Sequence, residues 1–306
     1  MAKASAVKFN VYDYVTQTII AAIEAGTGPW VKGWTGEVAR MGVPLRANGE
    51  PYRGINVLML WVEAHIKGYA SPTWMTYKQA QELGGQVRKG AQSTTVVKYG
   101  TFEVEQENAP ADADPEKRAY ARAYRVFNVD QIDGLAEHYY RRPEPPRDLG
   151  TEGDPQVQAW FDRLDIAIDT TDEPRAYYTP ATDRIHMPPI ETFYSAGKYF
   201  GTLSHEAAHA TKAEHRLNRQ HPGKSQERYS REEVVAELTA AMVATRLGIE
   251  TEYEQNAAYL AYWVGIMKED SRAVVKAASQ AQAACDWMFE QAGDLILSDT
   301  TAIAAE

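Results

Sequence analysis

Two histidines and a glutamate in one short stretch have the residue types and the spacing of a metal-dependent hydrolase. The run LSHEAAHATKAEH, residues 203–215, places His205 and His209 four positions apart, with Glu206 directly after the first. On a helix, positions i and i+4 share a face, so both imidazoles can bind one divalent ion while Glu206 lies beside the water that the ion activates. The HExxH spacing therefore predicts a zinc-hydrolase site with Glu206 as the catalytic base.

The HExxH motif fixes only three positions, so it also occurs by chance. The competing interpretation is that His205 and His209 are two surface histidines on an alanine-rich helix. The small residues Ala207, Ala208 and Ala210 favour a buried helix, because a solvated face would carry Lys, Glu or Gln instead. A hydrolytic zinc site also needs a third protein ligand and an open position for water. His215 has the spacing of the long metzincin motif, but that motif has Gly where this chain has Lys212.

A second predicted helix, REEVVAELTAAMVATRLG at residues 231–248, offers acidic alternatives for the third ligand. Glu233 and Glu237 are four apart and share a face, and His215 stays open as a further candidate. The segment resembles the gluzincins, in which a Glu-x-x-Ala-acid sequence gives its first acid to the metal. This resemblance implies that Glu233 is the ligand and that Glu237 forms a hydrogen bond with a ligand histidine. Glu232 lies off that face and fits a charged helix start.

The donor set and the segment before the first helix extend the hydrolase hypothesis. Two imidazoles and a carboxylate suit zinc and also accept manganese or cobalt. The segment DRIHMPP, residues 183–189, alternates apolar and polar residues and predicts a short strand. In zincins an edge strand at this place pairs with an extended peptide substrate. Tyr194 and Tyr229 are candidate oxyanion donors.

Composition and charge divide the chain into two halves. The net charge is −10, but residues 1–100 hold 11 Lys and Arg against 6 Asp and Glu, which leaves −15 for the remainder. The Pro- and Gly-rich segment 139–155 predicts a linker between a domain at 1–138 and a domain at 156–306, and the length allows a separate core for each. No apolar stretch predicts a membrane span or a signal peptide, and the single cysteine, Cys285, suits the cytoplasm.

The front half mixes aromatic and basic residues in loops and beside glycines. This mixture is typical of proteins that bind single-stranded DNA, because every base offers a ring to stack on and every linkage a phosphate. The competing interpretation is that most of these aromatics fill an ordinary core. The candidate DNA-binding residues are Trp30, Lys32, Trp34, Tyr52, Arg53, Trp74, Tyr77, Lys78, Arg88, Lys89 and Lys98.

Several stretches of the front half resemble one family. These are EAGTGPWVKGW, GEPYRGINVLMLW, SPTWMTYKQAQELGGQVRKG and VFNVDQIDGL. They are similar to the N-terminal domain of ArdC-type antirestriction proteins, which also occurs at the front of TraC-type plasmid primases. The resemblance implies an α+β single-stranded-DNA-binding domain joined to a zincin-like metallopeptidase domain with a short sheet and the HExxH helix. It also implies a plasmid setting and protection of incoming DNA from host restriction.

These observations lead to one hypothesis and its alternatives. We expect a conjugation-associated antirestriction protein that binds single-stranded DNA and carries a gluzincin-type metal site, whose peptide or protein substrate, if it cleaves one, could be a restriction component. The alternative is a metallopeptidase whose front domain recruits it to DNA-bound protein substrates. A third interpretation, a nuclease, is disfavoured because such sites gather several carboxylates around two metals.

Overall fold

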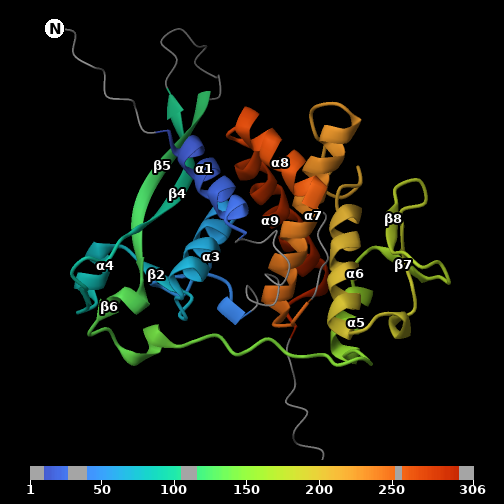
Figure 1. Ribbon diagram of the computed structural model, residues 1–306, viewed down its shortest axis with the longest axis horizontal. Coiled ribbons are helices and arrows are strands. Elements are labelled where there is room, and N and C mark those ends of the chain that lie inside the picture. Colours follow the sequence, from blue (N-terminus) through green and yellow to red (C-terminus); the bar gives the residue numbers. More distant parts are fainter. Residues whose placement is uncertain (1–9, 27–39, 105–115, 252–256, 296–306) are drawn as a thin grey trace, which may run out of the picture.

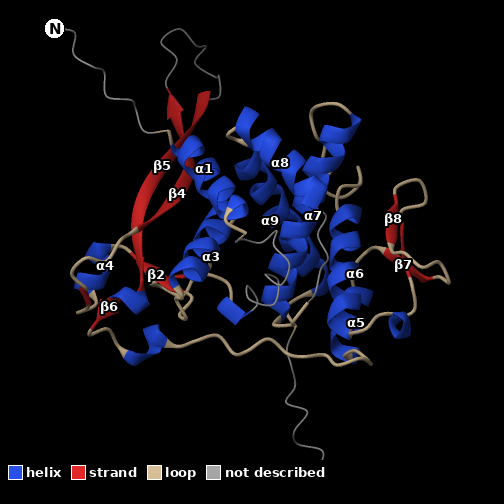
Figure 2. Cartoon of the chain, in the orientation of Figure 1, coloured by secondary structure: helices blue, strands red, loops and turns tan. Residues whose placement is uncertain are grey.

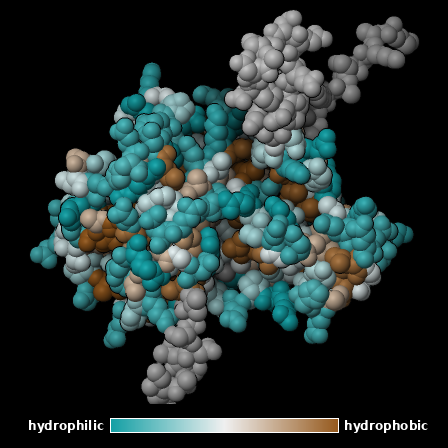
Figure 3. Space-filling model, turned by 180° about the vertical axis from the view of Figure 1, so that it is seen from behind, coloured by the Kyte–Doolittle hydropathy of each residue, from teal (hydrophilic) through white to brown (hydrophobic). Residues whose placement is uncertain are grey.

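The computed structural model describes residues 10–26, 40–104, 116–251 and 257–295. Its strands lie at two ends of the molecule, and most of its helices lie between them (Figures 1 and 2). Within the described residues, no helix is long and apolar enough to cross a membrane. On the face opposite to that of Figure 1, hydrophilic side chains predominate and hydrophobic residues form separate patches between them (Figure 3).

The front region is an α+β unit built on a long hairpin. Strands β4 (Thr94–Val104) and β5 (Glu116–Asn128) pair antiparallel, and β2 (Thr73–Met75) and β1 (Leu45–Arg46) extend the sheet in the order β1-β2-β5-β4. Helices α1 (Val11–Glu24) and α3 (Ile55–Lys67) pack against β5 and β4, respectively. A short helix, α4 (Tyr77–Glu82), precedes β3 (Gln86–Val87), which pairs with β6 (Ile132–Asp133). Strand β4 is therefore an edge strand of the larger sheet.

One side chain of α3 bonds to the open edge of β4 at a single residue, Val97. Asn56 accepts a hydrogen bond from the Val97 amide at 2.7 Å and donates one to the Val97 carbonyl at 2.8 Å. Gly54 precedes the helix, and its φ of 56° lies in the region that favours glycine. The amide of Asn56 satisfies two main-chain groups that an edge strand leaves unpaired.

The back region consists of a small sheet and a helical bundle. Strands β7 (Ala167–Thr170), β9 (Arg184–Met187) and β8 (Tyr177–Thr179) form the sheet in the order β7-β9-β8. Helix α5 (Pro155–Asp162) precedes this sheet, and α6 (Ala196–Ala210) follows it. Helices α7 (Ser225–Leu247), α8 (Ala257–Glu269) and α9 (Ala273–Ala292) complete the bundle. The short 3-10 turns are η1 (Val129–Gln131), η2 (Glu137–Tyr140) and η3 (Ile190–Thr192).

One hydrophobic core runs through both regions, although the length of the chain allowed two separate ones. Buried residues of α1 and α3 belong to the same cluster as those of α7 and α9. Two polar contacts also cross the junction: Thr16 donates to the Ser271 carbonyl at 2.7 Å, and the Gly54 amide donates to Gln282 at 3.0 Å. A smaller second cluster lies beneath α4 and β6. The front and back regions are thus packed together, not merely tethered.

The segment predicted as a linker runs along one edge of the molecule between η2 and α5 (Figure 1). It is held in place at Arg147, whose amide donates to the Gly248 carbonyl at 2.9 Å and whose carbonyl accepts from the Glu250 amide at 3.0 Å. The same two residues lie at the end of α7. The segment is therefore an extended strap on the back region.

Candidate functional site

The two histidines of the HExxH run lie near the C-terminal end of α6. Ser195 begins the helix by accepting a hydrogen bond from the Lys198 amide at 3.1 Å, and Ala207, Ala208 and Ala210 are fully buried. Small side chains let α7 approach closely. The predicted helix therefore forms with its alanines in the core.

Helix α7 brings Glu233 to the two imidazoles. The Nε2 atoms of His205 and His209 are 3.0 Å apart, and the Glu233 carboxylate lies 3.5 Å from the first and 3.3 Å from the second. Two ligand atoms about 2.1 Å from a zinc ion at the tetrahedral angle are about 3.4 Å apart. The spacing of the three side chains thus fits a tetrahedral ion with one position left for water. They form a candidate metal-binding group in the described part of the chain.

The carboxylate and the imidazoles of this group shift one another's pKa values. Burial opposes ionisation of Glu233, but hydrogen bonds with His205 and His209 outweigh it and hold the pKa of Glu233 well below its usual range. Burial also lowers the pKa of His209, yet hydrogen bonds to Glu232 and Glu233 raise this pKa to about 9. A histidine must be neutral to bind a metal. Metal uptake therefore requires His209 to release a proton.

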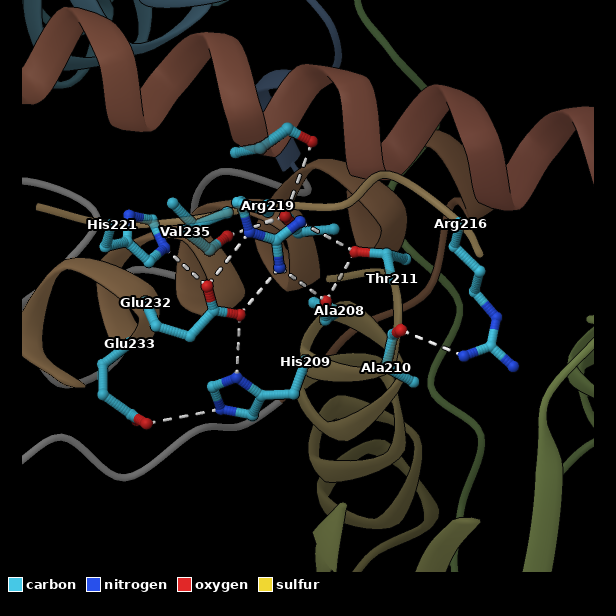
Figure 4. Close-up of polar contacts among 12 residues, drawn as sticks. Ala208, His209, Ala210, Thr211, Arg216, Arg219, His221, Glu232, Glu233 and Val235 are labelled. Atoms are coloured by element: carbon cyan, nitrogen blue, oxygen red, sulfur yellow. Dashed lines mark hydrogen bonds and ion pairs between the residues drawn. The ribbon is translucent and has the colours of Figure 1, made fainter. Parts of the chain in front are cut away.

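A carboxylate that we had assigned to a charged helix start supports the metal ligand. Glu232 is only 4% exposed, and its Oε1 lies 3.2 Å from His209 Nδ1 (Figure 4). A proton on Nδ1 bonds to this carboxylate and leaves Nε2 free to face the cluster. Glu232 thus fixes the tautomer and the orientation of the His209 ring.

Glu232 is itself held by two further groups. Arg219 donates to both of its oxygens, at 2.7 and 3.0 Å, and His221 Nε2 lies 2.6 Å from Oε2. The hydrogen bond with His209, together with those from His221 and Arg219, outweighs the effect of burial and keeps the pKa of Glu232 well below its usual range. Arg219 also donates to the Ala208 carbonyl at 2.9 Å, which ties the network back to α6. No sequence spacing pointed to this network, because its members come from α6, α7 and the turn between them.

Glu237, which the resemblance assigned to a ligand histidine, has a different setting from Glu232. Its Oε2 atom has no hydrogen-bond partner among the described residues. Burial, and then the charge of Glu233, raise the pKa of Glu237 to about 8. Glu232, one position before the ligand, takes the role that the resemblance had assigned to Glu237.

His215 and Tyr194 are not part of the metal group. Helix α6 ends at Ala210, and a turn carries His215 to the surface, where its Nε2 lies 3.1 Å from the Asp183 carboxylate. Tyr194 is 61% exposed and does not line the cleft beside the cluster. Tyr229 does line it, and burial followed by the charge of Glu233 raises its pKa.

Glu206 faces a cleft of about 900 Å³ that is lined by α6, the start of α7, the turn between them and the strand β8. Its Oε2 accepts a hydrogen bond from the Tyr178 amide of β8 at 2.9 Å. The expected edge strand, DRIHMPP, is instead central, because β9 lies between β7 and β8. Strand β8 is the edge next to α6, and its outward amide contacts the expected catalytic base.

The candidate DNA-binding residues of the front region separate into three groups. Trp30, Lys32 and Trp34 lie outside the described residues. Tyr52 and Trp74 are core residues with exposed fractions of 9% and 1%, so they are unavailable for base stacking, and for them the core interpretation was right. The exposed candidates are Arg53, Tyr77, Lys78, Arg88, Lys89 and Lys98.

Several of the exposed cations already have acidic partners. Arg53 forms an ion pair with Asp286 of α9, Lys78 with Glu82 at 3.4 Å, and Arg88 with Asp133 at 2.8 Å. Lys89 and Lys98 have no carboxylate partner among the described residues. Of the predicted DNA-binding cations, these two lysines are therefore the ones whose positive charge no nearby carboxylate in the described part of the chain neutralises.

Strand β5 supplies exposed residues that the prediction missed. Arg122 lies directly opposite Lys98 in the hairpin, and Tyr124, two positions on, shares their face. Arg125 is also exposed, and neither arginine pairs with a carboxylate in the part of the chain that is described. The signal was present in the strand-like run YARAYRV, whose alternation places Arg122 and Tyr124 on one face.

Comparison with known proteins identifies the family of this chain. Residues 9–127 match the N-terminal domain of the anti-restriction factor ArdC, and residues 155–280 match a zincin-like metallopeptidase. The crystal structure of the metal-free antirestriction protein ArdC from plasmid R388 superposes with a TM-score of 0.82 at 47% identity, covering 94% of this chain and 100% of that one. The chain belongs to the ArdC antirestriction family.

Other relatives extend this assignment. A Mn(II)-bound structure of the R388 ArdC protein gives a TM-score of 0.80 at 46% identity, with 94% of this chain and 100% of that one covered. An uncharacterised protein, y4eC of Sinorhizobium fredii, is 38% identical over 93% of each chain. The DNA primase TraC of Escherichia coli is 33% identical over 98% of this chain, which spans only 29% of the primase. An ArdC family member with this fold thus holds a divalent ion.

Proposed function

We propose that this protein binds single-stranded DNA with its front region and thereby protects DNA that enters by conjugation from host restriction. The observation that carries the proposal is the exposed pair of Lys98 and Arg122 on the β4–β5 hairpin, with Tyr124 beside it. Like charges placed directly opposite each other destabilise a hairpin, so a function is the better reason for keeping them. Phosphates would neutralise the pair while Tyr124 stacks on a base. Membership of the antirestriction family supports the same role.

Salt-dependent binding tests the DNA proposal. For the full-length protein, the logarithm of the affinity for an oligothymidylate should fall linearly with the logarithm of the salt concentration. Each phosphate contact should contribute about −0.7 to that slope. Replacing Lys98 and Arg122 together by alanine should reduce that slope by about 1.4. The matched control is Arg175→Ala, because Arg175 is an exposed cation of the back region, just before β8. An unchanged slope in the double variant would remove the hairpin from the DNA-binding surface.

The proposal also assigns the metal site. His205, His209 and Glu233 hold one divalent ion, for which zinc, manganese and cobalt all suit the donor set. When bound, the ion supplies a Lewis acid that lowers the pKa of a coordinated water. Glu206 lies one residue from the first ligand and would accept the proton of that water at its carboxylate. The Tyr178 amide occupies one acceptor site of Oε2, and the carboxylate has further sites for that proton.

A metallopeptidase recruited to DNA-bound protein substrates is the second candidate. It is favoured by the open cleft beside Glu206 and by the edge strand β8, to which an extended peptide could add. A restriction component would be a substrate of the appropriate class. Glu206→Gln separates the candidates, because it keeps the metal ligands and removes the base. Cleavage of a DNA-bound protein by the wild type, lost in this variant, would establish the second candidate.

A further inference from the structure

A second basic and aromatic surface lies at the junction between the front region and α9. A cleft of about 620 Å³ opens there. Its lining includes the cations Arg53, Arg272 and Lys276 and the aromatic rings of Tyr12 and Tyr99. Arg53 and Tyr99 come from the front region, whereas Arg272 and Lys276 lie at the start of α9. Neither of the two α9 residues was among the candidates from the sequence.

The positive charge of this cleft stands out against its surroundings. Residues 101–306 carry a net charge of −15, yet among the described residues that line the cleft only one, Asp286, is acidic. Asp286 forms an ion pair with Arg53, and Asp270 lies 4.0 Å from Lys276, at the limit of an ion pair. The guanidinium of Arg272 contacts no carboxylate in the described residues. The cleft therefore keeps an excess of positive charge that an anion can neutralise.

The aromatic residues of the cleft lie next to its cations. The Arg272 guanidinium lies over the Tyr12 ring at 5.0 Å from its centroid, and the Tyr12 and Tyr99 centroids are 6.2 Å apart. Tyr99 is 41% exposed, so one part of its ring remains open to a ligand. Cations beside a partly open ring are the combination that binds an unpaired nucleic-acid strand, since phosphate and base are both satisfied.

The cleft adjoins the DNA-binding hairpin. Tyr99 directly follows Lys98 on β4, and β4 is the edge strand of its sheet. Neighbouring residues of a strand point to opposite faces, so Lys98 belongs to the outer face of the hairpin and Tyr99 to the side of α1. A flexible single strand can pass around this edge, whereas a stiff duplex cannot follow so short a bend.

We propose that single-stranded DNA continues from the hairpin into this cleft, where α9 forms part of the DNA-binding surface. This proposal rests on the proposed function and extends it into the region that matches a metallopeptidase, residues 155–280. Arg272 and Lys276 contact phosphates, and Tyr99 stacks on a base. DNA binding would then hold the front and back regions against each other.

The phosphate contacts are tested with Arg272→Ala and Lys276→Ala combined in the full-length protein. Each lost contact should lower the log–log salt slope for oligothymidylate by about 0.7, so the double variant loses about 1.4. If the wild type and the variant bind equally at 1 M salt, each lost contact should weaken binding about 5-fold at 0.1 M salt. The double variant should then bind about 25-fold more weakly than the wild type. Both side chains are exposed, and an unchanged thermal unfolding curve would show that the variant folds.

The control and the stacking variant sharpen the test. Arg175 lies over the Tyr177 ring at 5.1 Å and is 77% exposed, just before β8 at the far side of the molecule from β4 (Figure 1). Arg175→Ala removes a cation with a similar ring contact and should leave the slope unchanged. Tyr99→Ala should weaken binding by about 5- to 150-fold without changing the slope, because a base contact releases no counterion.

The outcomes separate this proposal from the one on which it rests. If the wild type does not bind oligothymidylate, the proposed function fails. If the wild type binds and the α9 double variant behaves like Arg175→Ala, the cleft proposal fails while the hairpin remains. If duplex DNA loses the same affinity as the single strand in the double variant, the cleft binds polyanions in general, which would overturn the assignment to an unpaired strand.

Discussion

Glu232→Gln should weaken metal binding although Glu232 is not a ligand. The carboxylate accepts from His209 Nδ1 at 3.2 Å and from Arg219 at both oxygens. A charge-assisted hydrogen bond contributes about 1.5–3 kcal/mol and a neutral one about 0.5–1.5 kcal/mol. Replacing the carboxylate by an amide therefore costs about 1–1.5 kcal/mol at His209, or roughly 5- to 13-fold in affinity.

The geometry of the network increases this loss. Arg219 donates to both oxygens of Glu232, so either orientation of a glutamine amide places an NH₂ group against a donor of Arg219. The side chain would move and release the His209 ring. Loss of such a supporting contact typically costs 10- to 100-fold in metal affinity. We expect a decrease of about tenfold or more.

Glu237→Gln is the matched control on the same helix. Glu237 is partly buried, its Oε2 has no hydrogen-bond partner within the described residues, and its pKa of about 8 keeps it largely protonated at pH 7, so glutamine reproduces its charge. Competition with a chromogenic chelator at pH 7 measures the affinity of both variants, and chemical unfolding shows that they fold. A tenfold loss in Glu237→Gln, or none in Glu232→Gln, would refute the role that we assign to the network.

Three further predictions test the charges and the packing of the site. Metal affinity should rise about tenfold per pH unit up to about pH 9, because His209 must lose a proton to bind; a flat titration between pH 6 and 8 would contradict the raised pKa of His209. The metal-free wild type should lose stability relative to Glu237→Gln as the pH rises from 4.5 to 8, because the unfolded chain ionises Glu237 at a lower pH than the folded protein does. The loss should be at most about 1.4 kcal/mol for each unit by which the pKa of Glu237 is raised. Unfolding by urea at several pH values measures this difference, and an equal pH dependence in the two proteins would speak against it. Gly197→Ala should destabilise the protein by about 1–3 kcal/mol, because its new Cβ would lie 2.5 Å from the Glu250 carbonyl oxygen. Gly265→Ala in α8 has free space around the new Cβ and should stabilise the protein slightly. Thermal unfolding of the two variants compares them.

Local spacing and the gluzincin resemblance pointed to the three side chains that the structure brings together, His205, His209 and Glu233, but not to the residues that support them. His205 and His209 share a face because of the helical period alone, and the same period brought Glu233 into consideration. The choice between Glu232 and Glu237 depends on how α7 is rotated against α6 and on where the turn places Arg219. Both are contacts between elements that are distant in sequence, so no local pattern contains them.

The fold shows the same division between local and non-local information. The two helices of the site were predicted from their helical period at 203–215 and 231–248, and they are observed at Ala196–Ala210 and Ser225–Leu247, so each begins six or seven residues earlier than predicted. The central place of β9 depends on pairing with β7 and β8, and its alternation alone suggested an edge. Likewise, Trp74 and Tyr77 have similar sequence surroundings, yet the first is buried and the second is exposed.

The most direct test of the account is the efficiency of conjugative transfer into a restricting recipient, relative to a recipient without restriction. Because DNA binding is proposed as the protective act, protection should be lost when Lys98 and Arg122 are both replaced by alanine. Protection should persist in Glu206→Gln, which keeps the hairpin and the metal ligands. Full protection by the hairpin variant, or loss of protection in Glu206→Gln, would contradict the account.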